Sequence, residues 1–295
     1  MTQAADPTRD ATPTYEATST GNATLSPTDA FGGLRVAVII PALNEAPALP
    51  HVLAAIPSGV AMVIVADNGS TDGTGNVARK HGAVVVREPL RGYGRACLAA
   101  LAHLENGAAS GTHAAVDVVV FLDGDASDRP DEMLRLVAPI ADGSADLVIG
   151  SRTLGQREAG SLTPQQVFGN WLACTLIRLI WGVRFTDLGP FRAIRASALR
   201  DLAMADTDYG WTVEMQVKAA RAGLRTAEMP AGYRKRIGKS KVSGTIRGVF
   251  GAGTKILYVI GREAVFGPRV NANSGAVTGS SGAPDRPRTE KRPGT

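Results

Sequence analysis

Two aspartates, Asp123 and Asp125, stand one residue apart where the apolar run 116–122 ends. Like charges repel, so two neighbouring carboxylates are costly to bury without a partner. The pair can be solvated in a turn, because Asp-Gly is common turn chemistry. Alternatively, one acid can hold a proton, or both can face a cation. The rest of the sequence has to separate these three states.

Polar residues follow five short apolar runs in the same manner. The clusters are Asn44-Glu45, Asp67-Asn68-Gly69-Ser70, Arg91-Gly92-Tyr93-Gly94, Asp123-Gly124-Asp125 and Gly150-Ser151-Arg152. Solvated turns do not need carboxylates and small residues after every run, so the pattern favours a binding site. A carboxylate pair in such a site suits Mg²⁺ or Mn²⁺, with a nucleotide diphosphate or triphosphate as the other partner.

The apolar runs that position these clusters alternate with amphipathic stretches. We expect strands at 35–42, 61–67, 83–88, 116–123 and 146–151, separated by helices. This alternation predicts an α/β fold with a mostly parallel sheet and helices on both faces. Ligands of such sheets bind beyond the carboxyl ends of the strands, where the polar clusters lie.

The alternation ends after residue 152. The apolar pattern there predicts helices at 164–182 and 208–223, a strand at 224–230 and an amphipathic helix at 246–267. The three tryptophans, Trp171, Trp181 and Trp211, are expected in the core.

Composition sets the organisation of the chain, which has 295 residues and is 44% hydrophobic. We expect disordered tails at 1–33 and 268–295, around a domain at 34–245 and the helix at 246–267. The start lacks the basic and apolar regions of a signal peptide, and no run reaches the ~18–20 apolar residues of a membrane span. Cys97 and Cys174 are expected to be reduced core thiols, which suits the cytoplasm. The four histidines lack metal-ligand spacing.

The formal net charge is +5, and basic residues gather at 233–241. No nucleic-acid-binding motif accompanies them, so we expect no nucleic-acid partner. A phosphate-loop NTPase fits poorly, because five residues separate Gly232 from Gly238 where that motif needs four. A sugar-phosphate nucleotidyltransferase would need a Gly- and Arg-rich first loop, whereas this chain has "PALNEAPAL".

The segments "IIPALNE", "VADNGSTDGT", "FLDGDASDRP", "GSR" and "TDLGPFRA" occur in that order over about residues 35–245. Together they resemble the inverting family 2 glycosyltransferases with the GT-A fold, above all the dolichol-phosphate mannose synthase-like branch. The resemblance implies transfer of a sugar from a nucleotide diphosphate sugar with Mg²⁺ or Mn²⁺, and a C-terminal helical part on the acceptor side.

The resemblance also implies roles for individual residues. Donor binding falls to Pro41, Ala42, Asn44, Glu45, Asp67, Arg91, Gly92, Gly94 and Asp123. Asp123 and Asp125 correspond to the DxD metal motif. Asp187, Arg192 and Glu214 are implied near the transferred sugar or the acceptor, as catalytic residues. Arg152, Lys239, Ser240 and Lys241 are implied at the acceptor phosphate. Asn68 stands where the family often has a second acid, so pairing at that position departs from the family pattern.

The acceptor is the remaining question. A hydroxyl acceptor needs a general base, for which Asp187, Asp208 or Glu214 could serve. A phosphate monoester is already ionised, with a second pKa near ~6, and needs positive charge instead. The basic residues at 234–241 therefore favour a phosphate-bearing acceptor, most simply polyprenyl phosphate. There are two alternatives. One is a transferase for a soluble hydroxyl acceptor, and the other is a catalytically silent membrane-bound module that holds a nucleotide sugar.

Relatives that use polyprenyl phosphate often carry C-terminal membrane spans, and this chain departs from them. Its last apolar stretch is interrupted by Lys255, Arg262 and Glu263. It either lies on the bilayer surface or packs on the domain. We expect a cytoplasmic protein, with peripheral contact at the inner face of the membrane in the first case.

Overall fold

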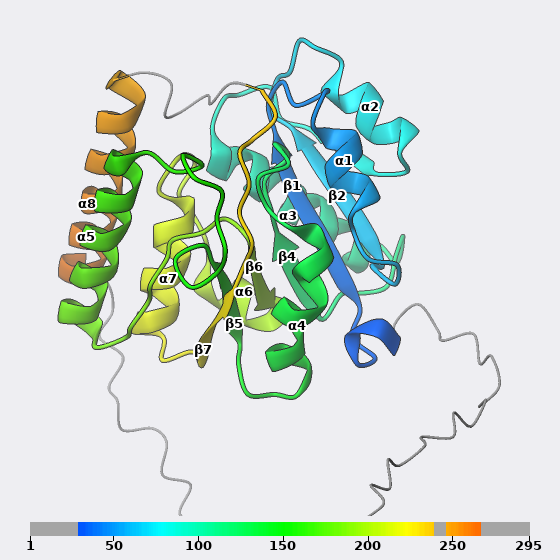
Figure 1. Ribbon diagram of the computed structural model, residues 1–295. Coiled ribbons are helices and arrows are strands. Elements are labelled where there is room, and N and C mark those ends of the chain that lie inside the picture. Colours follow the sequence, from blue (N-terminus) through cyan, green and yellow to red (C-terminus); the bar gives the residue numbers. More distant parts are fainter. Residues whose placement is uncertain (1–28, 239–245, 267–295) are drawn as a thin grey trace, which may run out of the picture.

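A single sheet positions the loops from which the candidate site is built. A computed structural model of the chain describes residues 29–238 and 246–266. Seven strands pair in the order β3-β2-β1-β4-β6-β5-β7, with helices on both faces of the sheet (Figure 1). The strands are β1 (Val36–Ala42), β2 (Met62–Asp67), β3 (Val84–Arg87), β4 (Val118–Phe121), β5 (Leu147–Ser151), β6 (Arg192–Arg195) and β7 (Thr226–Pro230). The predicted α/β fold with a mostly parallel sheet is confirmed.

Four of the six strand pairs are parallel: β1 with β2, β1 with β4, β2 with β3, and β5 with β7. Side chains of β1 alternate between the two faces, so Ala37 and Ile39 join one core while Val38 and Ile40 join the other. Both faces are covered, which explains why these strands are apolar throughout.

Strand β6 was not predicted from the sequence. It runs antiparallel between β4 and β5, with Arg192 opposite both Phe121 and Ile149. It has only four residues and an arginine at each end, so no apolar run marks it. Its amino end therefore lies at the same edge as the carboxyl ends of β4 and β5.

The helices form two groups. They are α1 (Leu49–Ala54), α2 (Thr74–Lys80), α3 (Tyr93–Ala109), α4 (Met133–Ala141), α5 (Pro164–Trp181), α6 (Ala196–Leu202), α7 (Trp211–Arg221) and α8 (Ile246–Phe266), with short 3₁₀ turns at Asp29–Phe31 and Pro130–Glu132. Helices α1, α2 and α4 contribute to one core, and α3, α5, α6, α7 and α8 to the other. Helix α5 contacts both α7 and α8, at one side of the molecule (Figure 1).

Helix α5 has clear start and stop signals. The Thr163 side chain accepts a hydrogen bond from the Gln166 backbone N–H, the Gln166 side chain accepts one from the Thr163 N–H, and Pro164 occupies the first turn. The helix ends at Gly182, which has φ 74°.

Helix α8 coincides with the predicted amphipathic helix. Val259 and Ile260 are buried against the domain, whereas Leu257, Tyr258 and Val265 are exposed. None of the helices in residues 29–238 and 246–266 combines the length and apolarity needed to cross a bilayer. Cys97 and Cys174 are buried free thiols. The predicted tail at 268–295, and residues 1–28 of the predicted tail at 1–33, lie outside the described residues. Phe31, in the remainder of the first predicted tail, is buried in the core.

Candidate active site

A hollow of about 590 Å³ opens at the carboxyl edge of the sheet. This volume is within the usual range for small-molecule sites. Its wall combines the loops after β1, β2, β4 and β5 with the start of α3 and parts of segments 208–212 and 233–236. Among the predicted site residues, the lining includes Pro41, Ala42, Glu45, Arg91, Gly92, Asp123, Asp125 and Arg152.

The two aspartates of the DxD sequence lie in the floor of the hollow. Tyr93 donates its hydroxyl to Asp123 Oδ1 at 3.1 Å. The Asp123 backbone N–H donates to Asp128, a third buried acid, at 3.0 Å. Burial, and next the charge of Asp125, raise the pKa of Asp123 to about 7. The site therefore concentrates negative charge that a cation would stabilise.

Asp125 is held on both of its oxygens. Its Oδ1 accepts the Ser127 backbone N–H at 3.0 Å, and its Oδ2 pairs with Arg236 Nη1 at 2.9 Å. Within the described residues, no group of three or more His, Cys, Asp or Glu side chains is placed to hold a metal. Two carboxylates with hard oxygen atoms still fit Mg²⁺ or Mn²⁺, because Mg²⁺ usually takes one or two carboxylates together with substrate phosphates.

Two of the predicted donor residues support the hollow rather than line it. Asn44, at φ 54°, accepts the Thr71 backbone N–H at 2.8 Å and so joins the first two loops. Asp67 Oδ1 accepts the Ser70 N–H at 2.9 Å. Neither side chain is part of the lining.

Asn68 is the residue of this loop that faces the hollow. Its side chain donates to the carbonyls of Glu88 and Leu90 and accepts the Gly92 N–H at 2.8 Å. It needs both donors and an acceptor for these bonds, which an aspartate could not supply. The departure from the family pattern at this position thus shapes the 88–92 loop.

The glycines at 92 and 94 are required by close packing. A Cβ at Gly94 would overlap the backbone carbonyl of Asp206, and one at Gly92 would overlap that of Thr207. Gly92 lines the hollow, but Gly94 does not. The start of α3 is thereby docked against the 206–209 segment, which carries Asp208 and Tyr209 into the opposite wall.

Arg152 reaches the hollow because Asp187 holds it. Asp187 is buried and accepts hydrogen bonds from the Arg152 backbone N–H, Nε and Nη2 at 2.7, 2.8 and 2.6 Å. The Arg152 guanidinium also lies 5.1 Å from the ring centre of Tyr233. Burial alone would lower the pKa of Arg152, but the bonds and charge of Asp187 raise it above its usual value. Asp187 itself does not line the hollow.

Arg192 does not line the hollow, in contrast to the expectation of a catalytic role. Its side chain is fully buried and donates to the carbonyls of Leu188, Gly189 and Thr212. It therefore ties the 188–189 turn to the start of α7. Burial lowers its pKa to about 10.

Glu214 also lies outside the lining of the hollow. It is fully buried, accepts the Asp206 N–H at 2.7 Å, and pairs with Lys218 at 2.9 Å and Arg262 at 3.4 Å. These bonds hold the 205–210 segment, which is the role that the structure shows for this carboxylate. The other expected acceptor residues, Lys239, Ser240 and Lys241, lie outside the described residues.

Several polar lining residues were given no site role from the sequence, among them Tyr93, Tyr209, Thr212, Tyr233 and Arg236, the ion-pair partner of Asp125. Tyr93 stands in the "RGYG" cluster, which was a usable signal. Arg236 was counted only as one member of a basic run, and charge alone could not indicate which member turns inward.

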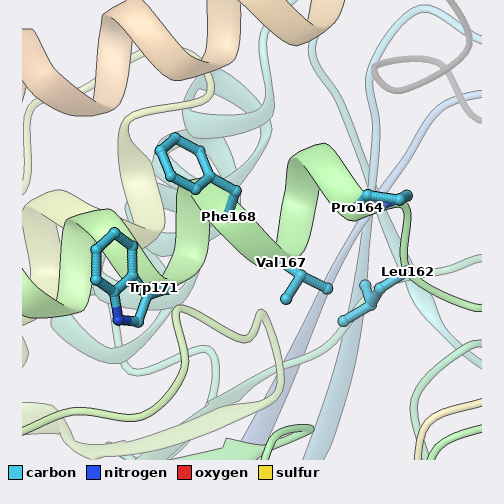
Figure 2. A pocket seen from close by; sticks show the side chains of 5 residues that line it. All are labelled: Leu162, Pro164, Val167, Phe168 and Trp171. Atoms are coloured by element: carbon cyan, nitrogen blue, oxygen red, sulfur yellow. The ribbon is translucent and has the colours of Figure 1, made fainter.

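A second, apolar hollow of about 520 Å³ lies along the first half of α5 (Figure 2). Leu162, Pro164, Val167, Phe168 and Trp171 line it. Phe168 and Trp171 are 60% and 59% exposed, so the expectation that all three tryptophans are core residues was wrong for Trp171. Gln166 of the same helix lines the first hollow, so α5 contributes side chains to both.

Comparison with known proteins identifies relatives of the chain. Residues 37–203 match the model of the family described as glycosyl transferase family 2. An uncharacterized glycosyltransferase of Mycobacterium tuberculosis is 39% identical over 224 residues, which cover 73% of this chain and 93% of the relative. The undecaprenyl-phosphate mannosyltransferase of Micrococcus luteus is 33% identical over 228 residues, covering 73% of this chain and 90% of the relative.

A solved structure has a similar fold. Glucosyl-3-phosphoglycerate synthase from Mycobacterium tuberculosis, in complex with Mn²⁺, uridine diphosphate glucose and phosphoglyceric acid, superposes with a TM-score of 0.58 at 25% identity. The match covers 80% of this chain and 82% of that one.

Proposed function

We propose that this chain, which belongs to glycosyltransferase family 2 and has the GT-A fold, transfers a sugar from a nucleotide diphosphate sugar to polyprenyl phosphate. In this reaction a phosphate oxygen of the acceptor forms a bond to the anomeric carbon. The bond from that carbon to the donor diphosphate breaks, and the nucleoside diphosphate leaves. As the family resemblance implies, the configuration at the anomeric carbon is inverted.

Asp123 and Asp125 are the residues that would hold a divalent cation. Bound there, the cation would neutralise charge on the leaving diphosphate. The concentration of buried acids in the floor of the hollow supports this assignment. So does the Mn²⁺ in the similar glucosyl-3-phosphoglycerate synthase.

We choose between the two kinds of acceptor from the ion pairs that the candidate general bases form. Of the three acids that could act as a base toward a hydroxyl, Asp187 is engaged by Arg152, and Glu214 by Lys218 and Arg262. The hollow instead presents the Arg152 guanidinium, held in a fixed orientation. An ionised phosphate needs such a cation and no base. Asp187 then acts as a positioning residue, because it orients Arg152.

The apolar hollow along α5, the helix that also contributes Gln166 to the first hollow, supports a lipid acceptor. With its phosphate near Arg152, a polyprenyl phosphate could run its chain along Phe168 and Trp171 of α5 (Figure 2). The similarity to the undecaprenyl-phosphate mannosyltransferase of Micrococcus luteus is consistent with this substrate class. We further propose that α5 and the exposed side of α8 meet the membrane surface during this reaction.

A soluble acceptor is the second candidate, because the similar synthase binds phosphoglyceric acid. Asp208 distinguishes the two, since it lines the hollow and is the one acid of the three not held in an ion pair among the described residues. With undecaprenyl phosphate as acceptor, Asp208→Asn should keep transfer within about ten-fold of the wild type. If the wild type instead uses phosphoglyceric acid, a loss of about 10²–10⁴-fold with that acceptor in Asp208→Asn would identify a general base and a hydroxyl acceptor. Product detection by mass spectrometry, with undecaprenyl phosphate and phosphoglyceric acid in parallel, makes this comparison.

A further inference from the structure

Arg236 occupies one side of Asp125, an acid proposed to hold the metal ion. Its Nη1 lies 2.9 Å from Asp125 Oδ2, while Ser127 takes Oδ1. The carboxylate is nearly buried and the arginine side chain is 29% exposed, so the pair is largely shielded from solvent. Both members line the hollow. The cation that neutralises Asp125 in this structure is thus part of the protein.

The backbone of the 234–237 segment fixes this arrangement. The Arg234 N–H donates to the Ser127 carbonyl at 2.9 Å, and the Ile237 N–H donates to the Asp125 carbonyl at 2.9 Å. The segment therefore runs along the DxD loop, and Arg236 is carried directly over the acid. Its neighbours Arg234 and Lys235 are exposed.

A free divalent ion would meet a like charge at this point. To bind Asp125 Oδ2 it must displace the guanidinium and leave it near a doubly charged ion. Among the described residues, the site offers two carboxylates and no third ligand of the His, Cys, Asp or Glu type. A donor diphosphate changes both conditions, because it adds oxygen ligands for the ion and an anionic partner for the arginine.

We propose that Arg236 makes metal binding conditional on the donor: it holds Asp125 in the free enzyme and transfers to the diphosphate when the metal and nucleotide bind together. The inference rests on the proposed metal-dependent function. It predicts positive coupling between the two ligands, so that each raises the affinity of the other by the same factor.

Titration with Mn²⁺ alone, followed by the electron paramagnetic resonance signal of the free ion, tests the first half of the proposal. Arg236→Gln should bind Mn²⁺ alone about ten-fold more tightly than the wild type, within the range usual for coupled sites. Arg236→Lys keeps the charge and should bind Mn²⁺ alone as weakly as the wild type. Thermal unfolding of each variant verifies that it is folded.

The same titration in the presence of UDP or GDP tests the second half. The wild type should bind Mn²⁺ at least about ten-fold more tightly with the nucleotide, and Arg236→Gln should lose most of this factor. Lys235→Gln is the matched control, because it removes the same charge at the neighbouring position. The Lys235 side chain is exposed and lies near Gly160. This variant should behave as the wild type does.

The outcomes separate the inference from the function on which it rests. If the wild type and Arg236→Gln bind Mn²⁺ alone with equal affinity, while Asp125→Asn removes the binding, the proposed role of Arg236 is refuted. The proposed metal site is then retained. If the wild type does not bind Mn²⁺ in the presence of either UDP or GDP, the metal-dependent function is refuted. The proposed role of Arg236 is then refuted as well. An equal change in Lys235→Gln would also overturn the inference, because it would reduce the effect to general surface charge.

Discussion

Replacing Asp187 by Asn should reduce both the stability of the protein and its affinity for the acceptor phosphate. Asp187 is 1% exposed and the Arg152 side chain is 14% exposed, so the substitution breaks a buried ion pair. Removing one partner of such a pair costs about 3–5 kcal/mol, because the other charge stays buried without compensation.

The Asn side chain keeps one oxygen acceptor, so part of the interaction survives. We therefore expect the free energy of unfolding to fall by about 2–4 kcal/mol. For a domain of this size each kcal/mol lowers Tm by about 2–4 °C, which predicts a fall of roughly 4–16 °C. In kinetic assays the KM for the acceptor phosphate should rise, because Arg152 loses its fixed orientation.

Asp146→Asn is the matched control for this experiment. Asp146 pairs with Arg225, whose side chain is 57% exposed, and with Arg195. Pairs exposed to this degree contribute about 1 kcal/mol or less. Thermal unfolding of the two variants side by side, with KM values for donor and acceptor, gives the comparison. Equal Tm values for the two variants, or an unchanged acceptor KM in Asp187→Asn, would refute the positioning role.

Three further predictions concern other parts of the molecule. Gly94→Ala should lower kcat/KM and cost about 1–3 kcal/mol of stability, since the added methyl group meets the Asp206 carbonyl; Gly169→Ala, with open space around it, should be neutral in both assays. Trp171→Ser should weaken transfer to undecaprenyl phosphate, whereas Leu134→Ser, an exposed apolar residue on α4, should not; equal losses would contradict the lipid hollow. Burial raises the pKa of Cys174 to about 12 and that of Cys97 well above its usual value, so both thiols stay protonated at pH 8. Ellman's reagent should detect neither thiol until denaturant is added, and rapid labelling of the native protein would contradict this.

The strands and their polar ends were predictable because both depend on short-range patterns. The apolar run before Asp123 and the small and polar residues after it are local features, and parallel pairing brings such ends to one edge whatever the details. Thr163, Pro164 and Gly182 likewise mark the limits of α5 in the sequence. By contrast, β6 was not predicted, because its four residues show no apolar run. It is buried because it pairs with β4 on one side and β5 on the other.

The sequence by itself determined the fold class, the family and the position of the carboxylate pair. Only the tertiary structure decided which polar side chains of the rim face the hollow. Asn68 faces it and Asp67 does not, and Arg236 crosses to Asp125 from more than a hundred residues further along the chain. Glu214 does not line the hollow and forms ion pairs with Lys218 and Arg262 instead. The physical reason is that the direction and charge partner of a side chain are set by elements packed against it from distant parts of the sequence, which no local pattern records.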